Sequence, residues 1–186
     1  MTNQQIYPQK ETTTRDNGYG MKLRFEFGEN TNSKYIANKT LINAWSEHLS
    51  GRVNRVDGAP MAANTKGESD AMREFTDSAN LCFSIVFKAA NIVDYAFWID
   101  ALKNGYMLDK LVVEQFKLNP SIPYGSYVYE KVKVTGISAL DLTIETPSQN
   151  PYFTVSFSST KLSIFDDTGV ELTTVTASRH ATVLKG

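Results

Sequence analysis

Side chains that could do covalent or acid–base chemistry are few in this chain and stand far apart. Its 186 residues include one cysteine, Cys82, and two histidines, His48 and His180. No histidines or cysteines stand at the spacing of a zinc site, and neither a GxSxG nucleophile motif nor a GxxxxGK[ST] phosphate loop occurs. The sequence therefore predicts no metal site, no bound cofactor and no enzyme active site.

Each of these residues, and each carboxylate pair, has a structural explanation. Cys82 lies in the apolar run LCFSIVF, which predicts a buried, inert thiol. His48 lies on a possible helix, where an exposed or structurally paired histidine is expected, and His180 lies near the C-terminus. Asp94 and Asp100 fall on one expected helix at a spacing that does not bring them to one face, which argues against a catalytic acid pair.

A basic and aromatic pattern occurs in the stretch YVYEKVKVTGI, residues 127–137. Lys131 and Lys133, with the two tyrosines, could bind single-stranded nucleic acid by phosphate contact and stacking. The neighbouring Glu130 and the net charge of −1 favour a solvated sheet face instead. No nucleic-acid partner is therefore expected.

Composition is that of a globular protein of one domain. Hydrophobic residues make up 41% and charged residues 21%, which allows a packed core. The single cysteine allows no internal disulfide. No apolar stretch has the length of a membrane helix or of a signal-peptide core. The expectation is a chain made in the cytoplasm that inserts into no membrane and leaves the cell, if at all, without a classical signal.

Three regions are expected along the chain. Residues 1–20 are rich in Thr, Asn and Gln and predict a flexible N-terminal arm. Residues 21–176 would form the single domain, and residues 177–186 a C-terminal tail. Within the domain, residues 52–79 mix Gly, Pro, Asn and charge, which predicts a long surface loop with little structure of its own.

Two stretches have helical character. Residues 40–51 place Leu41, Trp45 and Leu49 on one face, behind a possible cap at Thr40. The better-marked helix lies within residues 91–106. There Asn91 can cap the start, and Asn104-Gly105 can end the helix. This second helix is apolar on more than one face, so it is expected to sit against a sheet. The apolar positions that recur at helical spacing are Ile92, Tyr95, Ala96, Ile99 and Leu102.

The remaining elements are expected to be strands. Residues 21–28 alternate cleanly, with Leu23, Phe25 and Phe27 on one face. Further strands are predicted at residues 81–89, 108–118, 127–137, 151–167 and 170–178. In the strand at 151–167 the apolar residues change parity, which predicts a bulge or corner at residues 158–160.

The strand at 127–137 alternates on two faces. Val128, Val132 and Val134 are expected to point into the core. The opposite face would be available to a cavity or to a neighbouring copy, and it carries Tyr129, Lys131, Lys133 and Thr135. Together the elements predict a mainly β protein, a two-sheet β-barrel with one flanking α-helix and a long loop.

The order of these elements resembles a known family. A helix containing YAFWIDAL is followed by the turn KNGY, the strand LDKLVVEQFKL, the strand YVYEKVKVTGI and the segment PYFTVSFSSTKLSIF. This order is similar to that of the type VI secretion tube protein, the hemolysin-coregulated protein family, which is related to tail-tube proteins of contractile phages. The resemblance covers residues 81–166 and, more weakly, residues 22–27. Residues 29–80 depart from it.

The resemblance implies a structural subunit without catalytic residues. Copies would form a ring, usually a hexamer, and rings would stack into a tube inside a contractile sheath, capped by a spike. The tube would be expelled from the cell, and its lumen would carry effectors. The face of Tyr129, Lys131, Lys133 and Thr135 would then line the lumen or a subunit interface, and the arm and the long loop would contact neighbouring copies. The alternative is a small-ligand or carbohydrate binding barrel in which Trp45, Trp98 and the tyrosines line a pocket.

Overall fold

The coordinates are a computed structural model of the whole chain. The residues it describes are 6–8, 21–28, 33–57, 61–62, 78–116, 123–140 and 151–177. Most of the predicted arm, much of the predicted loop and nearly all of the predicted tail, with His180, therefore lie outside the described residues. Those three region boundaries remain predictions.

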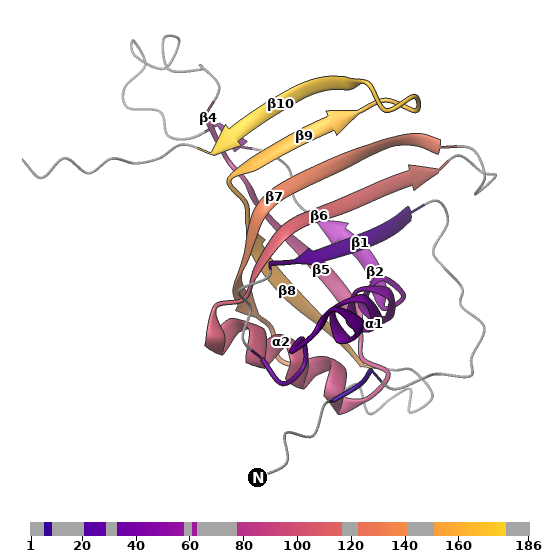
Figure 1. The fold of residues 1–186 in the computed structure, drawn as a ribbon. Helices are drawn as coiled ribbons and strands as arrows, with labels where there is room; N and C mark the ends of the chain where they lie inside the picture. The colour runs from indigo at the N-terminus through magenta and orange to yellow at the C-terminus, as the bar shows by residue number, and fades with distance from the viewer. Residues whose placement is uncertain are drawn as a thin grey trace, which may run out of the picture.

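Within the described residues the chain forms ten strands and two helices (Figure 1). The first five strands are β1 (Met21–Phe27), β2 (Val53–Asp57), β3 (Met61–Ala62), β4 (Ser78–Asn80) and β5 (Cys82–Lys88). The other five are β6 (Met107–Phe116), β7 (Pro123–Ile137), β8 (Tyr152–Ser158), β9 (Lys161–Phe165) and β10 (Glu171–Ala177). The helices are α1 (Lys39–Ser50) and α2 (Ile92–Asn104).

All ten strands belong to one sheet, ordered β2-β5-β8-β7-β9-β10-β4-β3, with β6 also paired to β7 and β1 paired to β6. The pairs are antiparallel except for the short β10–β4 contact. Figure 1 shows that the sheet is strongly curved and that both helices lie together at one end of it. The predicted mainly β, barrel-like fold is confirmed. The two expected sheets are two halves of one continuous sheet, because the long strand β7 runs through both halves.

The strand β7 joins the halves by changing partner along its length. Its first half, Ser126–Glu130, pairs with β9, and its second half, Lys133–Ile137, pairs with β8. The chain between β8 and β9 must turn at the same place. Ser159 and Thr160 make this turn, so the corner predicted at residues 158–160 is confirmed.

The core lies between the concave side of the sheet and the two helices. Leu23, Phe25 and Phe27 of β1 are buried, as the alternation predicted. Aromatic rings dominate the core: Trp45 of α1 stacks on Phe97 of α2 with ring centroids 4.5 Å apart. Offset and edge-on aromatic contacts add to the stabilisation that burial of apolar area provides.

Helix α1 packs its expected face, and its N-cap lies two residues before the predicted one. Leu41, Trp45 and Leu49 are fully buried. The predicted cap at Thr40 is wrong, because the Asn38 side chain accepts from the backbone N–H of Leu41 and Thr40 lies inside the helix. Asparagine is among the best N-cap residues because its short amide oxygen reaches the free N–H groups of the first turn.

Helix α2 has the predicted ends and buries a different face from the one its apolar spacing indicated. Asn91 accepts from two backbone N–H groups, and Gly105 ends the helix at φ 63°, a left-handed conformation that glycine adopts without strain. The buried residues of the helix are Asp94, Phe97, Trp98 and Ala101. Three of the five predicted contact residues are exposed instead, namely Ile92, Ile99 and Leu102.

Part of the predicted loop is a strand. Val53–Asp57 forms β2 and pairs with β5, and β3 and β4 are two further short strands within or beside the loop. The prediction of little structure is therefore wrong at these positions. The residues of β2 have mixed polarity, and the pairing partner that makes them a strand lies about thirty residues further along the chain.

The described part of the predicted arm touches the domain. The backbone carbonyl of Ile6 accepts from the indole N–H of Trp45 at 3.1 Å, and the Ile6 side chain packs against the core. Neither of the two described helices has the length and apolar character needed to cross a membrane.

Candidate functional site

The predicted site strand changes the face it turns to the core at Lys131, which has a positive φ of 50°. Tyr129 before it is buried, and so are Val132 and Val134 after it, so the core-facing positions change from odd to even numbers. A non-glycine residue in this region is uncommon and marks a local distortion of the strand. Val128, expected in the core, is only half-buried and alternates with the buried Tyr129.

Three of the four predicted site residues are surface residues, and one is a core residue. Lys131, Lys133 and Thr135 are exposed. Tyr129 is 7% exposed and its ring stacks on that of Phe83, with centroids 4.2 Å apart. The expectation that Tyr129 shares an open face with the lysines is therefore wrong. Burial raises the pKa of the Tyr129 phenol, which fits its place in the core.

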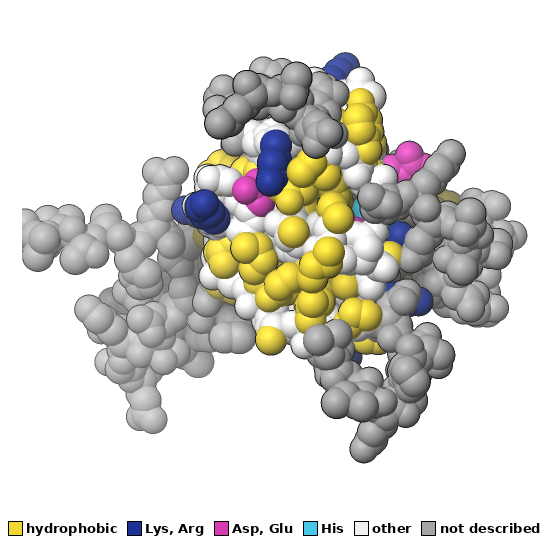
Figure 2. Space-filling model, turned by 90° about the horizontal axis from the view of Figure 1, so that it is seen from below, with side chains coloured by type: hydrophobic (Ala, Val, Ile, Leu, Met, Phe, Trp, Pro, Cys, Tyr) yellow, Lys and Arg dark blue, Asp and Glu magenta, His cyan; other side chains and the backbone are white. Residues whose placement is uncertain are grey.

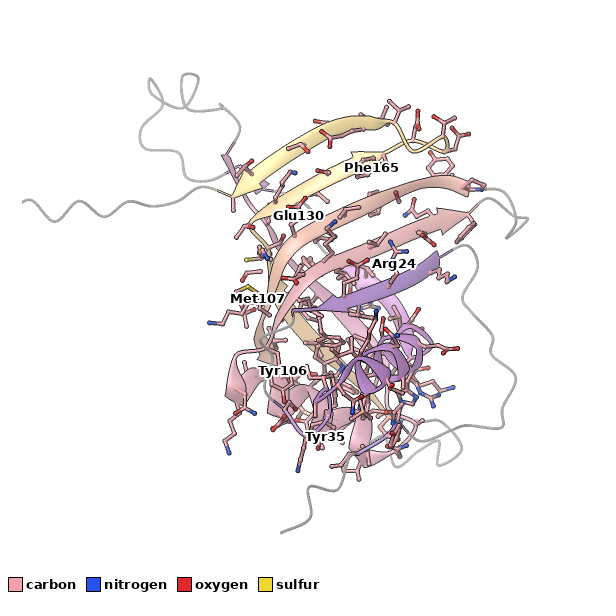
Figure 3. All side chains as sticks on the ribbon, in the orientation of Figure 1. Arg24, Tyr35, Tyr106, Met107, Glu130 and Phe165 are labelled. Atoms are coloured by element: carbon pink, nitrogen blue, oxygen red, sulfur yellow. The ribbon has the colours of Figure 1, made fainter. Side chains whose placement is uncertain are left out.

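A row of alternating charges crosses four neighbouring strands on the outward face of the sheet. The register places Glu26 beside Lys110, Lys110 beside Glu130, and Glu130 beside Lys161. The Lys161 ammonium lies 3.1 Å from the Glu130 carboxylate. Opposite charges at directly paired positions stabilise a sheet, and here they make one polar surface of both signs. Figure 3 places Glu130 on this curved part of the sheet.

Sequence reasoning missed this row. Glu130 entered only as a negative charge beside two lysines, and Lys161 and Lys110 lie in separate strands. The row appears only when the strand register is known, since a shift of one residue would turn each side chain to the other face.

A second ion pair marks the distorted part of β7. The Lys131 ammonium lies 2.8 Å from the Asp109 carboxylate of β6. Both side chains are about half exposed, at 56% and 45%, so the pair contributes at most about 1 kcal/mol. The Lys131 side chain therefore points toward β6 at the protein surface. It stands at the position where β7 changes the face that it buries.

The corner between β8 and β9 is tied to the same part of β7. The Ser159 hydroxyl lies 2.8 Å from the backbone carbonyl of Glu130, and the backbone N–H of Thr160 donates to that carbonyl at 3.1 Å. Ser159 is buried, at 6% exposure. These bonds satisfy backbone groups that a broken ladder would otherwise leave without partners.

The histidine and the carboxylates singled out in the sequence hold the helices in place. His48 of α1 lies 2.5 Å from the buried carboxylate of Asp94 on α2. The same carboxylate accepts from the backbone N–H of Ala90 at 2.9 Å and lies 3.7 Å from the Arg52 guanidinium. The prediction of a structurally paired His48 is confirmed.

Asp100 has a separate set of partners, as the spacing predicted. It accepts from the Ser33 hydroxyl at 3.0 Å, the Asn104 amide at 2.9 Å and the Tyr106 phenol. Burial, together with this bond to Asp100, raises the pKa of Tyr106. Asp94 and Asp100 therefore anchor the two ends of α2 to different parts of the chain.

The cysteine does not lie where the sequence indicated. Cys82 is exposed, whereas its neighbours Phe83 and Ile85 are buried. The apolar run around Cys82 predicted burial, but alternation along β5 turns the thiol outward. Within the described ranges, no group of three or more His, Cys, Asp or Glu side chains is arranged to hold a metal ion.

The two tryptophans proposed to line a pocket are core residues. Trp45 and Trp98 are both 0% exposed. Trp98 contacts the rings of Phe25, Phe87 and Phe157 at centroid distances of 6.0, 5.1 and 5.4 Å. They fill the space between the helices and the sheet and do not line an open binding site.

These features define a class of protein. It has a barrel-like β fold with helices at one end and a polar outward face on the sheet, and its buried titratable side chains hold the fold together. No protein-family model matches the sequence, and no curated protein matches it either. Solved structures of Hcp proteins, however, match its fold over nearly their whole length.

One match is a mutant of the Hcp1 protein from E. coli EAEC 042, with a TM-score of 0.55, 11% identity, and coverage of 84% of this chain and 98% of that one. A second is the secreted protein Hcp3 from Pseudomonas aeruginosa, with a TM-score of 0.53, 10% identity, and coverage of 86% and 99%. A type six secretion system protein matches with a TM-score of 0.51, 16% identity, and coverage of 84% and 91%. The predicted resemblance is confirmed at the level of fold: this chain has the fold of Hcp proteins.

Proposed function

We propose that this protein is a structural subunit of the inner tube of a contractile injection apparatus of the type VI secretion kind. The observation that carries the proposal is the fold match, which spans 98% and 99% of two Hcp chains and 84% and 86% of this one. A match of that extent covers nearly the whole of each Hcp chain and is not limited to a shared fragment. Copies would form a closed ring of about six, the number that the resemblance to the hemolysin-coregulated protein family implies, and rings would stack into a tube.

The described surface suits such a subunit. Lys131, Lys133 and Thr135 are exposed on the second half of β7, and the charged row from Glu26 to Lys161 covers the outward face of its first half and its neighbours. We assign these polar faces to the tube lumen or to contacts between subunits. A polar lumen of mixed charge would let effector proteins pass without strong binding.

The partners follow from the same assignment. A contractile sheath would surround the tube, a spike would cap it, and effectors would travel within it. The subunit would assemble in the cytoplasm and leave the cell with the tube. The Hcp3 protein from Pseudomonas aeruginosa, which has this fold, is a secreted protein, and this supports the proposal that the present chain is exported.

The alternative function, a small-ligand or carbohydrate binding barrel, loses its main support in the structure. It required Trp45 and Trp98 to line a pocket, and both side chains are fully buried in aromatic packing.

Light scattering coupled to size-exclusion chromatography tests the proposal. The 20.8 kDa chain should elute as a closed assembly of about six copies whose mass is constant over a range of concentrations. A mass equal to one chain at every concentration would contradict a self-assembling tube subunit and would return the ligand-binding alternative to consideration.

A further inference from the structure

The end of α2 carries an exposed apolar patch edged by lysines. Ile99, Leu102 and Met107 are 41%, 38% and 43% exposed. Leu102 and Lys103 both lie beside Ile99 on the exposed side of the helix, because residues three and four apart are neighbours there. Figure 2 shows the molecule from the side of the helices, where hydrophobic side chains gather in one patch with charged side chains at its edge.

A second lysine borders the same patch. Lys133 of β7 pairs with Met107 across the β6–β7 ladder, and its side chain lies over Gly105 at the end of α2. Within the described residues, neither Lys103 nor Lys133 forms an ion pair. We call Ile99, Leu102, Lys103, Met107 and Lys133 the basic end patch.

The turn between β9 and β10 carries the opposite combination. Val170 and Leu172 are 59% and 64% exposed, among the highest values for large apolar side chains in the described chain. Asp167 and Glu171 are exposed beside them, and within the described residues neither forms an ion pair. We call these four residues the acidic tip.

The acidic tip has a fixed shape. The Asp166 carboxylate accepts from the backbone N–H groups of Thr168 and Val170 at 2.9 and 2.8 Å and from the Thr168 hydroxyl at 2.7 Å. The backbone N–H of Asp166 donates to the carbonyl of Val170 at 3.0 Å. A turn closed by this many bonds presents its side chains in one arrangement, so binding through it orders little of the chain.

The two surfaces lie at opposite ends of the molecule. In Figure 1 the C-terminal end of α2 lies at the lower left and the β9–β10 turn at the upper right. Figure 3 shows the same separation between Met107, beside the basic end patch, and Phe165, the last residue of β9. They therefore cannot meet within one chain, but each can meet its counterpart on another copy.

We propose that the acidic tip of one copy contacts the basic end patch of the next copy, head to tail, in the assembled tube. Each surface offers exposed apolar side chains and unpaired charge, and the charges have opposite signs, which favours this contact over tip-to-tip or patch-to-patch contact. A contact between two different patches of one chain propagates from copy to copy, as rings and stacked tubes require. The inference rests on the proposed function, because it supplies a contact for that assembly.

Charge reversal with rescue tests the contact. Asp167→Lys with Glu171→Lys, and separately Lys103→Glu with Lys133→Glu, should each raise the concentration at half assembly by at least about tenfold at low salt. The quadruple variant restores opposite signs across the contact and should assemble close to the wild-type concentration. Arg55→Asp with Asp57→Arg, which swaps the two charges of an exposed ion pair on β2, is the control and should leave assembly unchanged.

Cysteine cross-linking tests the geometry in a Cys82→Ser background, which removes the exposed native thiol. A chain carrying Leu172→Cys and Leu102→Cys should form a ladder of covalent multimers on oxidation. The control pairs Leu172→Cys with Ile92→Cys, which is also exposed on α2 but lies about 15 Å further along the helix. A disulfide needs Cα atoms within roughly 7 Å, so the control should give no ladder.

The outcomes separate this inference from the proposed function. Suppose that the wild-type protein assembles, that each variant with one reversed surface assembles equally well, and that no ladder forms. The proposed contact is then wrong, and the tube assignment stands. If wild-type protein never assembles, the tube assignment fails and the contact fails with it. Three results together would establish the contact. Assembly weakens when one surface is reversed, it recovers in the quadruple variant, and a ladder forms with Leu102→Cys but not with Ile92→Cys.

Discussion

Asp94 holds three separate parts of the chain together with one buried carboxylate. It is 1% exposed and contacts His48 of α1, Arg52 before β2 and the backbone N–H of Ala90. A charge removed from water in this way is tolerated only when its partners satisfy it. At the scale of residues, His48, Asp94 and Asp100, three of the groups that suggest chemistry in the sequence, therefore fix the two helices at the end of the sheet.

Replacing Asp94 by Ala should cost about 3–5 kcal/mol of the free energy of unfolding, because it leaves buried polar partners without their acceptor. Urea denaturation at a concentration where all variants have one native mass measures the change. Asp94→Asn keeps an acceptor oxygen and should lose less. The control is Asp57→Ala, whose carboxylate pairs with Arg55 and is 45% exposed, and which should cost at most about 1 kcal/mol. Equal losses in Asp94→Ala and the control would show that the buried carboxylate is not an anchor.

Asp166 should titrate below the ordinary range of an aspartate. The Thr168 hydroxyl is the largest cause, and the backbone N–H groups of Val170 and Thr168 lower the pKa further, because all of them favour the ionised carboxylate. Since the folded pKa lies below the unfolded one, the stabilisation is present above the unfolded value and is lost as pH falls through the folded pKa.

An NMR titration of the Asp166 carboxyl carbon measures this shift. The midpoint should fall below about 3.9, the value for an unperturbed aspartate. Thr168→Val removes the hydroxyl donor and should move the midpoint upward. Thr173→Val, at an exposed position on β10 that makes no bond to Asp166, should leave it unchanged. A wild-type midpoint at the ordinary value would mean that the turn at the acidic tip is open in solution.

At the scale of elements, local signals located both helices and most of the longer strands, whereas β2 and the packing of the elements depended on distant residues. Both ends of α2 were predictable, because Asn91 and Gly105 act on backbone groups within a few residues of themselves. The face that α2 buries was not predictable. The helix is apolar on more than one side, and the sheet selects Phe97, Trp98 and Ala101 while leaving Ile99 and Leu102 exposed.

The corner of the sheet was predictable from the sequence of β8 and β9 but not from the sequence of β7. In β8 and β9 the buried apolar positions change from odd to even numbers between Phe157 and Leu162, and this change is visible in the sequence. In β7 the change falls on Lys131, a residue type that gives no sign of a positive φ, and for this reason Tyr129 was assigned to the wrong face. Glycine at that position would have signalled the distortion, because glycine is the residue that adopts a positive φ without strain.

Gly125 should prove essential to the pairing of β7 with β9. A Cβ at this position would lie 2.8 Å from the backbone carbonyl oxygen of Phe165. Gly125→Ala should therefore cost about 1–3 kcal/mol, as overpacking does when backbone must move. Gly136→Ala is the matched control in the same strand, where the nearest atom would lie 3.8 Å from the new Cβ. It should change the free energy of unfolding by at most about 0.5 kcal/mol. Equal effects in urea denaturation would contradict the close approach.

At the scale of the whole molecule, the fold was within reach of the sequence and the polar surface was not. Strand patterns and the order of elements led to the Hcp resemblance, which the structural matches bear out as a fold. The row from Glu26 to Lys161 and the two end surfaces depend on register and on placement in space, which a single sequence does not contain. The surfaces that would join copies are therefore known only from the folded chain.

The central claim is that copies of this chain assemble into a tube, and electron microscopy of negatively stained, purified protein tests it most directly. The account predicts rings of about six subunits with a central hole, alone or stacked into tubes. Single compact particles without a hole, at concentrations well above those of the scattering experiment, would contradict it.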